Sequence, residues 1–172
     1  LDFTLFTSGK LRLALLVLAV VLFSNISSVS AATYYSRATG NWNGAVWSTS
    51  ATGTATTATI TSSDNVIIQA NNNITVNVAN AVCKSLSLGT NNNIAILTFA
   101  ASSQLTVSGA VTLGKATNIS YRGSIVMTNG GKLICNSLAL GNTGTNTFTS
   151  GSGTVELTAT NTLPATIFTQ FN

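Results

Sequence analysis

The chain has 172 residues, of which 45% are hydrophobic and only 6% are charged, with a formal net charge of +4 and no histidine. Its few cations are scattered rather than clustered, which excludes a surface built to bind a nucleic-acid backbone. Its high content of apolar and β-branched residues excludes a disordered chain kept in solution by charge.

The first 32 residues have the pattern of a secretory signal peptide. Lys10 and Arg12 precede an apolar run at 13–23, which is followed by a polar stretch and then by small residues. This order predicts cleavage after Ala31 or Ala32. The apolar run is shorter than the about 20 residues that a membrane span requires, and a retained membrane anchor is the alternative. After cleavage we expect a secreted or cell-surface protein without membrane association.

Residues 33–63 are predicted to form an N-terminal cap. The segment is dense in aromatic residues at its start and continues into a tract in which Thr alternates with Ala and Gly. An open stack of strands presents unpaired backbone groups at its end, and such a segment is well placed to cover that edge. Aromatic rings with polar edges also form sugar-stacking platforms. The candidate glycan-binding residues are therefore Tyr34, Tyr35, Trp42 and Trp47, with a packed cap as the favoured interpretation.

Residues 64–172 contain a repeat that predicts a β-solenoid. Three segments, 82–89, 107–114 and 134–141, end in the same order: an apolar residue, any residue, Leu and Gly. The closing glycines are 25 residues apart (89 to 114) and then 27 residues apart (114 to 141). A period in the twenties is typical of proteins whose repeats bury their apolar sides against one another. Short apolar bursts with two-residue alternation, separated by Asn-, Gly- and Ser-rich turns, predict the strands.

We therefore predict an all-β fold, a parallel β-helix or β-solenoid of about four coils with an N-terminal cap, preceded by a signal-peptide helix. A β-sandwich of antiparallel hairpins is the alternative, because Asn-Gly pairs also mark hairpin turns. The pattern stops near residue 172 without a cap, so we expect the solenoid to be truncated there and the chain to be the N-terminal piece of a longer protein.

Alignment on the closing glycines places Cys83, Ser108 and Cys135 in one column. Two coils of separation put the two thiols about 9 to 10 Å apart. The Cα atoms of a disulfide are closer than about 7 Å. Both cysteines are thus predicted to be free and buried, where a thiol behaves as a small apolar group.

Residues 33–172 offer little catalytic chemistry. Their only carboxylates are Asp64, predicted to be a turn residue, and Glu156, predicted to point outward from a strand. We expect about 14 Å between them along the stack, whereas glycoside hydrolysis needs about 5 to 9.5 Å. Cys83 has no base on its own face of a strand. With so few ligands we expect no metal or cofactor, and we predict that the chain is not an enzyme.

Several short motifs carry a resemblance to a known family. They are Tyr34-Tyr-Ser-Arg37, Gly40-Asn-Trp-Asn43, Trp47-Ser48, Asp64-Asn-Val-Ile-Ile68, Ile74-Thr-Val76 and Cys83-Lys-Ser-Leu-Ser-Leu88. Together they resemble the opening of large exported Bacteroidota proteins that are built of β-solenoid repeats and usually end in a sorting domain for type IX secretion. The resemblance implies a secreted or cell-surface, adhesin-like protein, and it supplies no catalytic residues.

The sequence thus favours an exported, non-enzymatic β-solenoid segment that acts as the stalk or binding surface of an adhesin-like protein. Its expected partners are surface glycans or other cell-surface proteins. The alternative is the non-catalytic N-terminal module of a secreted polysaccharide-degrading enzyme, whose active site would follow residue 172.

Overall fold

The computed structural model describes residues 30–160 and 163–164. Within these ranges the chain is all-β and contains no helix, so it has none that could cross a membrane. The predicted signal-peptide helix lies outside the described residues. The strands are β1 (Thr33–Ser36), β2 (Gly40–Asn41), β3 (Trp47–Ser48), β4 (Asn65–Ile68), β5 (Asn73–Val76), β6 (Ala81–Cys83), β7 (Ser85–Leu88), β8 (Asn93–Phe99), β9 (Gln104–Leu113), β10 (Tyr121–Val126), β11 (Lys132–Leu140), β12 (Thr147–Thr149) and β13 (Thr154–Leu157).

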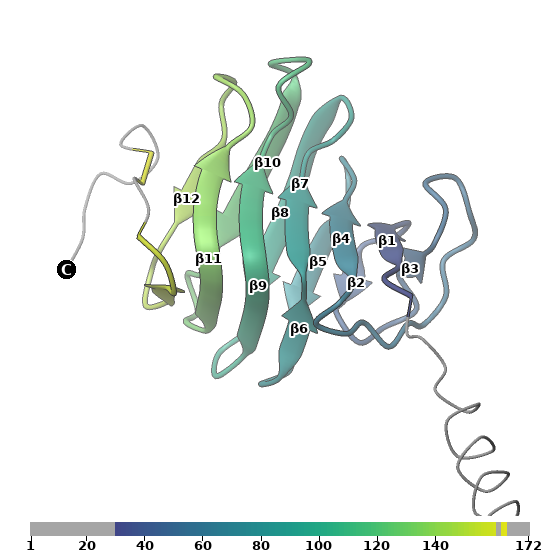
Figure 1. Cartoon of the computed structure of the whole chain (residues 1–172), viewed down its shortest axis with the longest axis horizontal. Coiled ribbons are helices and arrows are strands. Elements are labelled where there is room, and N and C mark those ends of the chain that lie inside the picture. Colours follow the sequence, from purple (N-terminus) through teal and green to yellow (C-terminus); the bar gives the residue numbers. More distant parts are fainter. Residues whose placement is uncertain (1–29, 161–162, 165–172) are drawn as a thin grey trace, which may run out of the picture. The chain divides into compact units, whose positions relative to one another are not determined.

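The strands form two sheets that the chain visits in turn. One sheet has eight strands in the order β13-β11-β9-β7-β4-β1-β3, with β6 beside β9, and the other has the order β12-β10-β8-β5-β2. All pairs of these named strands are parallel except β1 with β3. In Figure 1 the sheet with β7, β9 and β11 lies in front of the sheet with β8 and β10. The described residues therefore form a parallel β-solenoid of about three turns, and the solenoid, not the β-sandwich, is confirmed.

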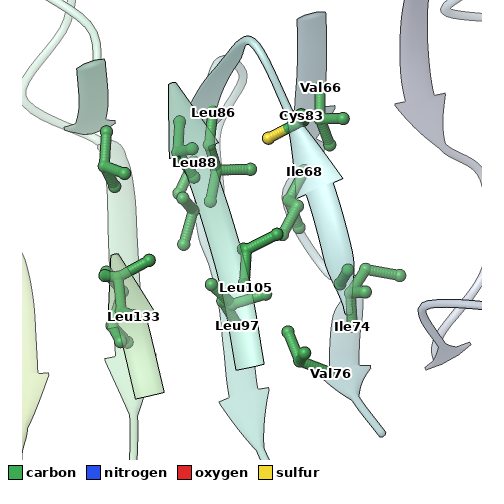
Figure 2. Packing of buried hydrophobic residues seen from close by; sticks show 14 of the residues in the cluster. Val66, Ile68, Ile74, Val76, Cys83, Leu86, Leu88, Leu97, Leu105 and Leu133 are labelled. Carbon is green, nitrogen blue, oxygen red and sulfur yellow. The ribbon is translucent and has the colours of Figure 1, made fainter. Parts of the chain in front are cut away.

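Inward-facing side chains of both sheets make the core. In β8, Ala95, Leu97 and Phe99 are fully buried, and the residues between them are only half-buried. Figure 2 shows side chains such as Leu97 and Leu105, from opposite sheets, meeting in the space between the strands. Full burial of one such side chain contributes about 1.5 to 3 kcal/mol. The stacked aliphatic columns therefore hold the two sheets together.

The columns at the end of the repeat have the predicted register. Leu88, Leu113 and Leu140 pair across β7, β9 and β11, and so do the apolar residues two positions earlier in each strand. Two of the closing glycines have left-handed backbone angles, with φ of +72° at Gly89 and +78° at Gly114. Glycine adopts such angles without strain, which explains why the repeat ends in this residue.

Further back in the same strands, the predicted register is wrong by one residue. Val107, and not Ser108, pairs with Cys83 and with Cys135. The cause is one additional residue in β9, where Gly109 takes the extra inward position between two buried valines. A Cβ atom at Gly109 would lie 2.8 Å from the Lys84 carbonyl oxygen, so no side chain fits at this position.

The predicted state of the two cysteines is confirmed despite this shift. Cys83 and Cys135 are free and buried. They lie two strands apart, with Val107 between them. This separation corresponds to about 9 to 10 Å, too far for a disulfide.

Candidate functional site

The two tryptophans of the aromatic segment lie in the core. Trp42 and Trp47 are both buried, and their rings meet edge to face with centroids 5.2 Å apart and an interplanar angle of 70°. The Trp47 Nε1–H group donates a hydrogen bond of 2.7 Å to the Trp42 carbonyl oxygen. As packed here, neither ring offers a free face to a sugar, and both fill the space beneath β2 and β3 as a packed cap would.

The two tyrosines of the segment remain half-buried on β1. Tyr34 packs against the core, and Tyr35 pairs with Ser48 of β3 on one side and with Ile67 of β4 on the other. The strand that carries them is thus an integral part of the larger sheet. Glycan binding at these residues stays a prediction, and the tyrosines are the members of the set that keep exposed surface.

Asp64 is held in the turn that precedes β4, as predicted. Asp64 is only 4% exposed, and its carboxylate accepts three hydrogen bonds: from the Ala32 N–H group (2.8 Å), the Thr61 N–H group (2.8 Å) and the Thr61 hydroxyl (2.7 Å). Burial raises the pKa of Asp64, but these hydrogen bonds outweigh it, so the pKa lies below the ordinary value of 3.8. A buried carboxylate that accepts three hydrogen bonds from its own chain acts as a structural anchor rather than as a group presented to a substrate.

Glu156 points outward from β13 and forms an ion pair of 2.7 Å with Lys132. Both side chains are well exposed, so the pair adds little stability. Four strand spacings separate β13 from β4, which puts Glu156 about 19 Å from Asp64, farther than the predicted distance. The two carboxylates are therefore not placed to act on one substrate.

The thiols are equally poor candidates for chemistry. Burial raises the pKa of Cys83 to about 12, with the charge of Asp64 adding to the effect, and burial raises the pKa of Cys135 to about 11. A thiol reacts as its thiolate, which is scarce at neutral pH under these conditions. Among the described residues, no three His, Cys, Asp or Glu side chains come together as a metal site would require.

A different surface has the form of a binding site, and we call it the turn depression. It is an open hollow of about 760 Å³ along the edge of the solenoid where the chain passes from the eight-stranded to the five-stranded sheet. Each of the three turns that line it directly follows a closing glycine of the repeat. The lining residues are Asn92 from the first turn with Asn93 of β8, Asn118, Ile119 and Ser120 from the second turn with Arg122 of β10, and Thr143, Gly144 and Thr145 from the third turn.

The second and third turns of the depression are fastened together by one amide. The Asn142 Nδ2 group lies 3.1, 2.7 and 2.7 Å from the carbonyl oxygens of Lys115, Asn118 and Tyr121. These oxygens belong to the turn and strand start of the preceding coil, so a single side chain fixes the path of both loops. Turns held in this way lose little conformational entropy when a ligand binds.

Asn146 continues this network into the core. Its Nδ2 group donates to Asn142 Oδ1 at 2.9 Å, and its own Oδ1 accepts a hydrogen bond of 2.8 Å from the Gly123 N–H group. Asn146 is buried, and Gly123 lies so close to the facing sheet that a Cβ atom there would be 2.8 Å from Leu88 Cβ. The floor of the turn depression is thereby tied to the packed columns.

Two side chains give the depression its character. Arg122 supplies a guanidinium group, and the ion pair found among the described residues, Lys132 with Glu156, leaves Arg122 without a carboxylate partner. Ile119 is 65% exposed, which is unusual for a large aliphatic side chain in this fold. The lining thus combines a cation, an apolar contact and several amides and hydroxyls. It suits a polar ligand that also presents apolar surfaces made of C–H groups.

Sequence reasoning did not find the turn depression. The Asn-rich runs in the sequence indicate only turn residues, because the hollow forms between turns of different coils. The signal available in the sequence is the position of these turns, each directly after a closing glycine and one of them close to Arg122. No family model, curated protein or solved structure matches this chain.

Proposed function

We propose that this chain is an exported, non-enzymatic β-solenoid segment that serves as the binding surface or stalk of a larger, adhesin-like cell-surface protein. In this proposal the whole architecture is a signal-peptide helix, an N-terminal cap and about four coils, and the parent protein is a Bacteroidota substrate of type IX secretion. The support is the solenoid itself together with the sequence pattern of the leader and the N-terminal motifs.

The observation that carries the binding role is the turn depression. Its second and third turns are preorganised by the Asn142 and Asn146 network, and its lining combines the Arg122 guanidinium with exposed amides and hydroxyls. Hydroxyl-rich ligands are recognised by such convergent polar groups next to an apolar contact, here Ile119. We therefore assign surface glycans as the ligand class, with a preference for glycans that carry carboxylate or sulfate groups for Arg122 to bind.

The test is a glycan array probed with the purified chain and two point variants. Arg122→Ala is expected to weaken binding of acidic glycans about tenfold or more, because one charge-assisted hydrogen bond is lost. The matched control is Lys84→Ala, which removes the same charge from an exposed position that does not line the depression. Ile119→Ala is expected to weaken binding without changing the preference for acidic glycans.

Two results would overturn the assignment. Binding that survives Arg122→Ala unchanged would remove the turn depression as the site. Binding that is lost in Tyr35→Ala and retained in Arg122→Ala would move the site to the aromatic segment.

The alternative, a non-catalytic module of a polysaccharide-degrading enzyme, would use the same polar depression to hold a polysaccharide chain. The sequence of the complete gene separates the two, because the alternative requires an acid-rich catalytic domain after residue 172.

A further inference from the structure

Asp64 receives a hydrogen bond from a backbone group far away in the sequence. The Ala32 N–H group donates to Asp64 Oδ1 at 2.8 Å, across 32 residues of chain. The carbonyl oxygen of the same residue accepts a hydrogen bond of 2.8 Å from the Asn65 N–H group. Both polar backbone groups of Ala32 are thus engaged by the turn that starts the solenoid.

The residues immediately before Ala32 are not held in this way. Ser30 and Ala31 are exposed, and the compact unit of the fold begins at Ala31. Small residues at 29–31 fit the specificity of a signal peptidase, and the sequence left cleavage after Ala31 or after Ala32 open. The hydrogen bonds of Ala32 distinguish these two positions.

We propose that the chain is processed between Ala31 and Ala32, and that the α-ammonium group so formed at Ala32 makes a partly buried ion pair with the Asp64 carboxylate. The proposal rests on the proposed export of the protein. A signal peptidase would hydrolyse the peptide bond: water adds across it, Ala31 leaves as a carboxylate, and the amine of Ala32 takes up the released proton. The nitrogen that donates to Asp64 as a neutral amide before cleavage would carry a positive charge after it.

Cleavage one residue later would have the opposite effect. A chain that starts at Thr33 lacks both backbone groups of Ala32, so Asp64 Oδ1 loses a donor and the Asn65 N–H group loses its acceptor. Buried polar groups without partners destabilise a fold. Cleavage after Ala31 instead keeps both hydrogen bonds and converts one into a charge-assisted bond, which is roughly twice as strong as a neutral one.

The surroundings of Asp64 leave the new charge without a competitor. Cys83 interacts electrostatically with Asp64, and burial keeps its thiol neutral by raising its pKa to about 12. Lys84 donates its backbone N–H group to the Asp64 carbonyl oxygen, but its side chain is exposed. Thr61, the third neighbour, is uncharged. The Asp64 carboxylate therefore has one cation to pair with, the amine of Ala32.

The ion pair would be sensitive to high pH. An α-amino group ordinarily has a pKa of about 7.7 to 8.0, and a neighbouring carboxylate raises it. Because the folded pKa is raised, the stabilisation is complete below about pH 7.7 and is lost as the pH rises through the folded pKa. The ion pair would therefore stabilise the first strand of the mature protein at neutral and mildly acidic pH, as long as the Asp64 carboxylate stays ionised.

The first experiment reads the processing site directly. The full chain, with its leader, is expressed in a Gram-negative host, and the exported product is analysed by intact mass and N-terminal sequencing. We expect the mature chain to begin at Ala32. A product that begins at Thr33 or elsewhere overturns the proposal while leaving export intact, and a product that retains the leader overturns both.

The second experiment tests the ion pair without export. The chain from Ala32 onward, which contains the compact unit and its core, is prepared with a free amine and with an acetylated amine. The acetylated form keeps the neutral N–H donor of the precursor, so it is a matched control. We expect the free amine to raise the Tm by about 4 °C at pH 6.5, and the difference to vanish above about pH 9.5.

Two variants complete this test. Asp64→Asn is expected to abolish the difference between free and acetylated amine, and Glu156→Gln, which removes a remote carboxylate, is expected to preserve it. Equal Tm values for the free and acetylated chains at pH 6.5, or a difference that persists in Asp64→Asn, would overturn the proposal.

Discussion

Replacing Leu113 with alanine is expected to lower the free energy of unfolding by about 3 to 4 kcal/mol. Leu113 is fully buried between Leu88 and Leu140 in the central column. The residue that faces it is Gly123, where a Cβ atom would lie only 3.1 Å from Leu113 Cα. Because a glycine has no side chain to move into the space left by the leucine, the cavity persists. The cost therefore lies well above the lower end of the range of about 2 to 5 kcal/mol for such substitutions.

The assay is thermal and urea unfolding of the purified chain, followed by far-UV circular dichroism. For about 130 ordered residues, an unfolding entropy of about 0.27 kcal/mol/K converts this loss into a Tm decrease of about 11 to 15 °C. The urea midpoint should shift with an unchanged slope, since the surface exposed on unfolding hardly changes.

Leu140→Ala is the matched control, because Leu140 occupies the same column one strand further on but is only half-buried. We expect it to cost about half as much as Leu113→Ala. A loss at Leu113 equal to or smaller than the loss at Leu140 would refute the argument that the facing glycine keeps the cavity open.

Three further predictions concern the register, the thiols and the buried carboxylate. Val107→Ser should destabilise the fold by about 2 kcal/mol, whereas Ser108→Val should be nearly neutral; chemical denaturation compares them, and the reverse order would restore the register predicted from the sequence. Cys83 and Cys135 should resist a thiol reagent at pH 8 in the folded state and react in urea. The raised pKa values of the two thiols should also contribute stability that is complete below their ordinary pKa of 9.0 and is lost as the pH rises towards about 11 and 12. Rapid labelling of the native protein would contradict both the expected resistance of the thiols and their raised pKa values. The lowered pKa of Asp64 should contribute stability that is complete above pH 3.8 and is lost as the pH falls through its folded pKa. Asp64→Asn should therefore be destabilising at pH 6 and should show a weaker dependence of Tm on pH between 2 and 4, and an unchanged acid profile would mean that the carboxylate is not anchored as described.

The sequence predicted the solenoid because its strongest signal is local. Alternation of inward and outward residues and a closing glycine recur in each coil, and Leu88, Leu113 and Leu140 follow directly from them. The shift beyond Gly109 did not follow, since alignment on the closing glycines assumes strands of equal length. The extra residue shows in the hydrophobic pattern as a spacing of four residues from Val107 to Val111, against three from Cys135 to Leu138, but alignment on the closing glycines does not use this spacing.

The candidate site was harder to predict than the fold. The aromatic pattern fits both a sugar-stacking platform and a packed cap, the favoured interpretation, and the burial of Trp42 and Trp47 depends on how β2 and β3 close the end of the stack. The turn depression depends on contacts between Asn142 and carbonyl groups more than 20 residues away. Such contacts become visible only when the coils are stacked.

The extra residue in β9 also bears on how repeats of this kind can change over time. In a paired strand, a one-residue insertion ordinarily exchanges the buried and solvent faces of everything beyond it. Here β9 alternates without interruption from Leu105 to Leu113, and the difference in length is absorbed in β11, where Cys135 and Leu138 both stay buried although they are three residues apart. Duplicated coils can therefore gain or lose single residues without losing their core, and the turns that carry the depression are free to diverge in length on an unchanged scaffold.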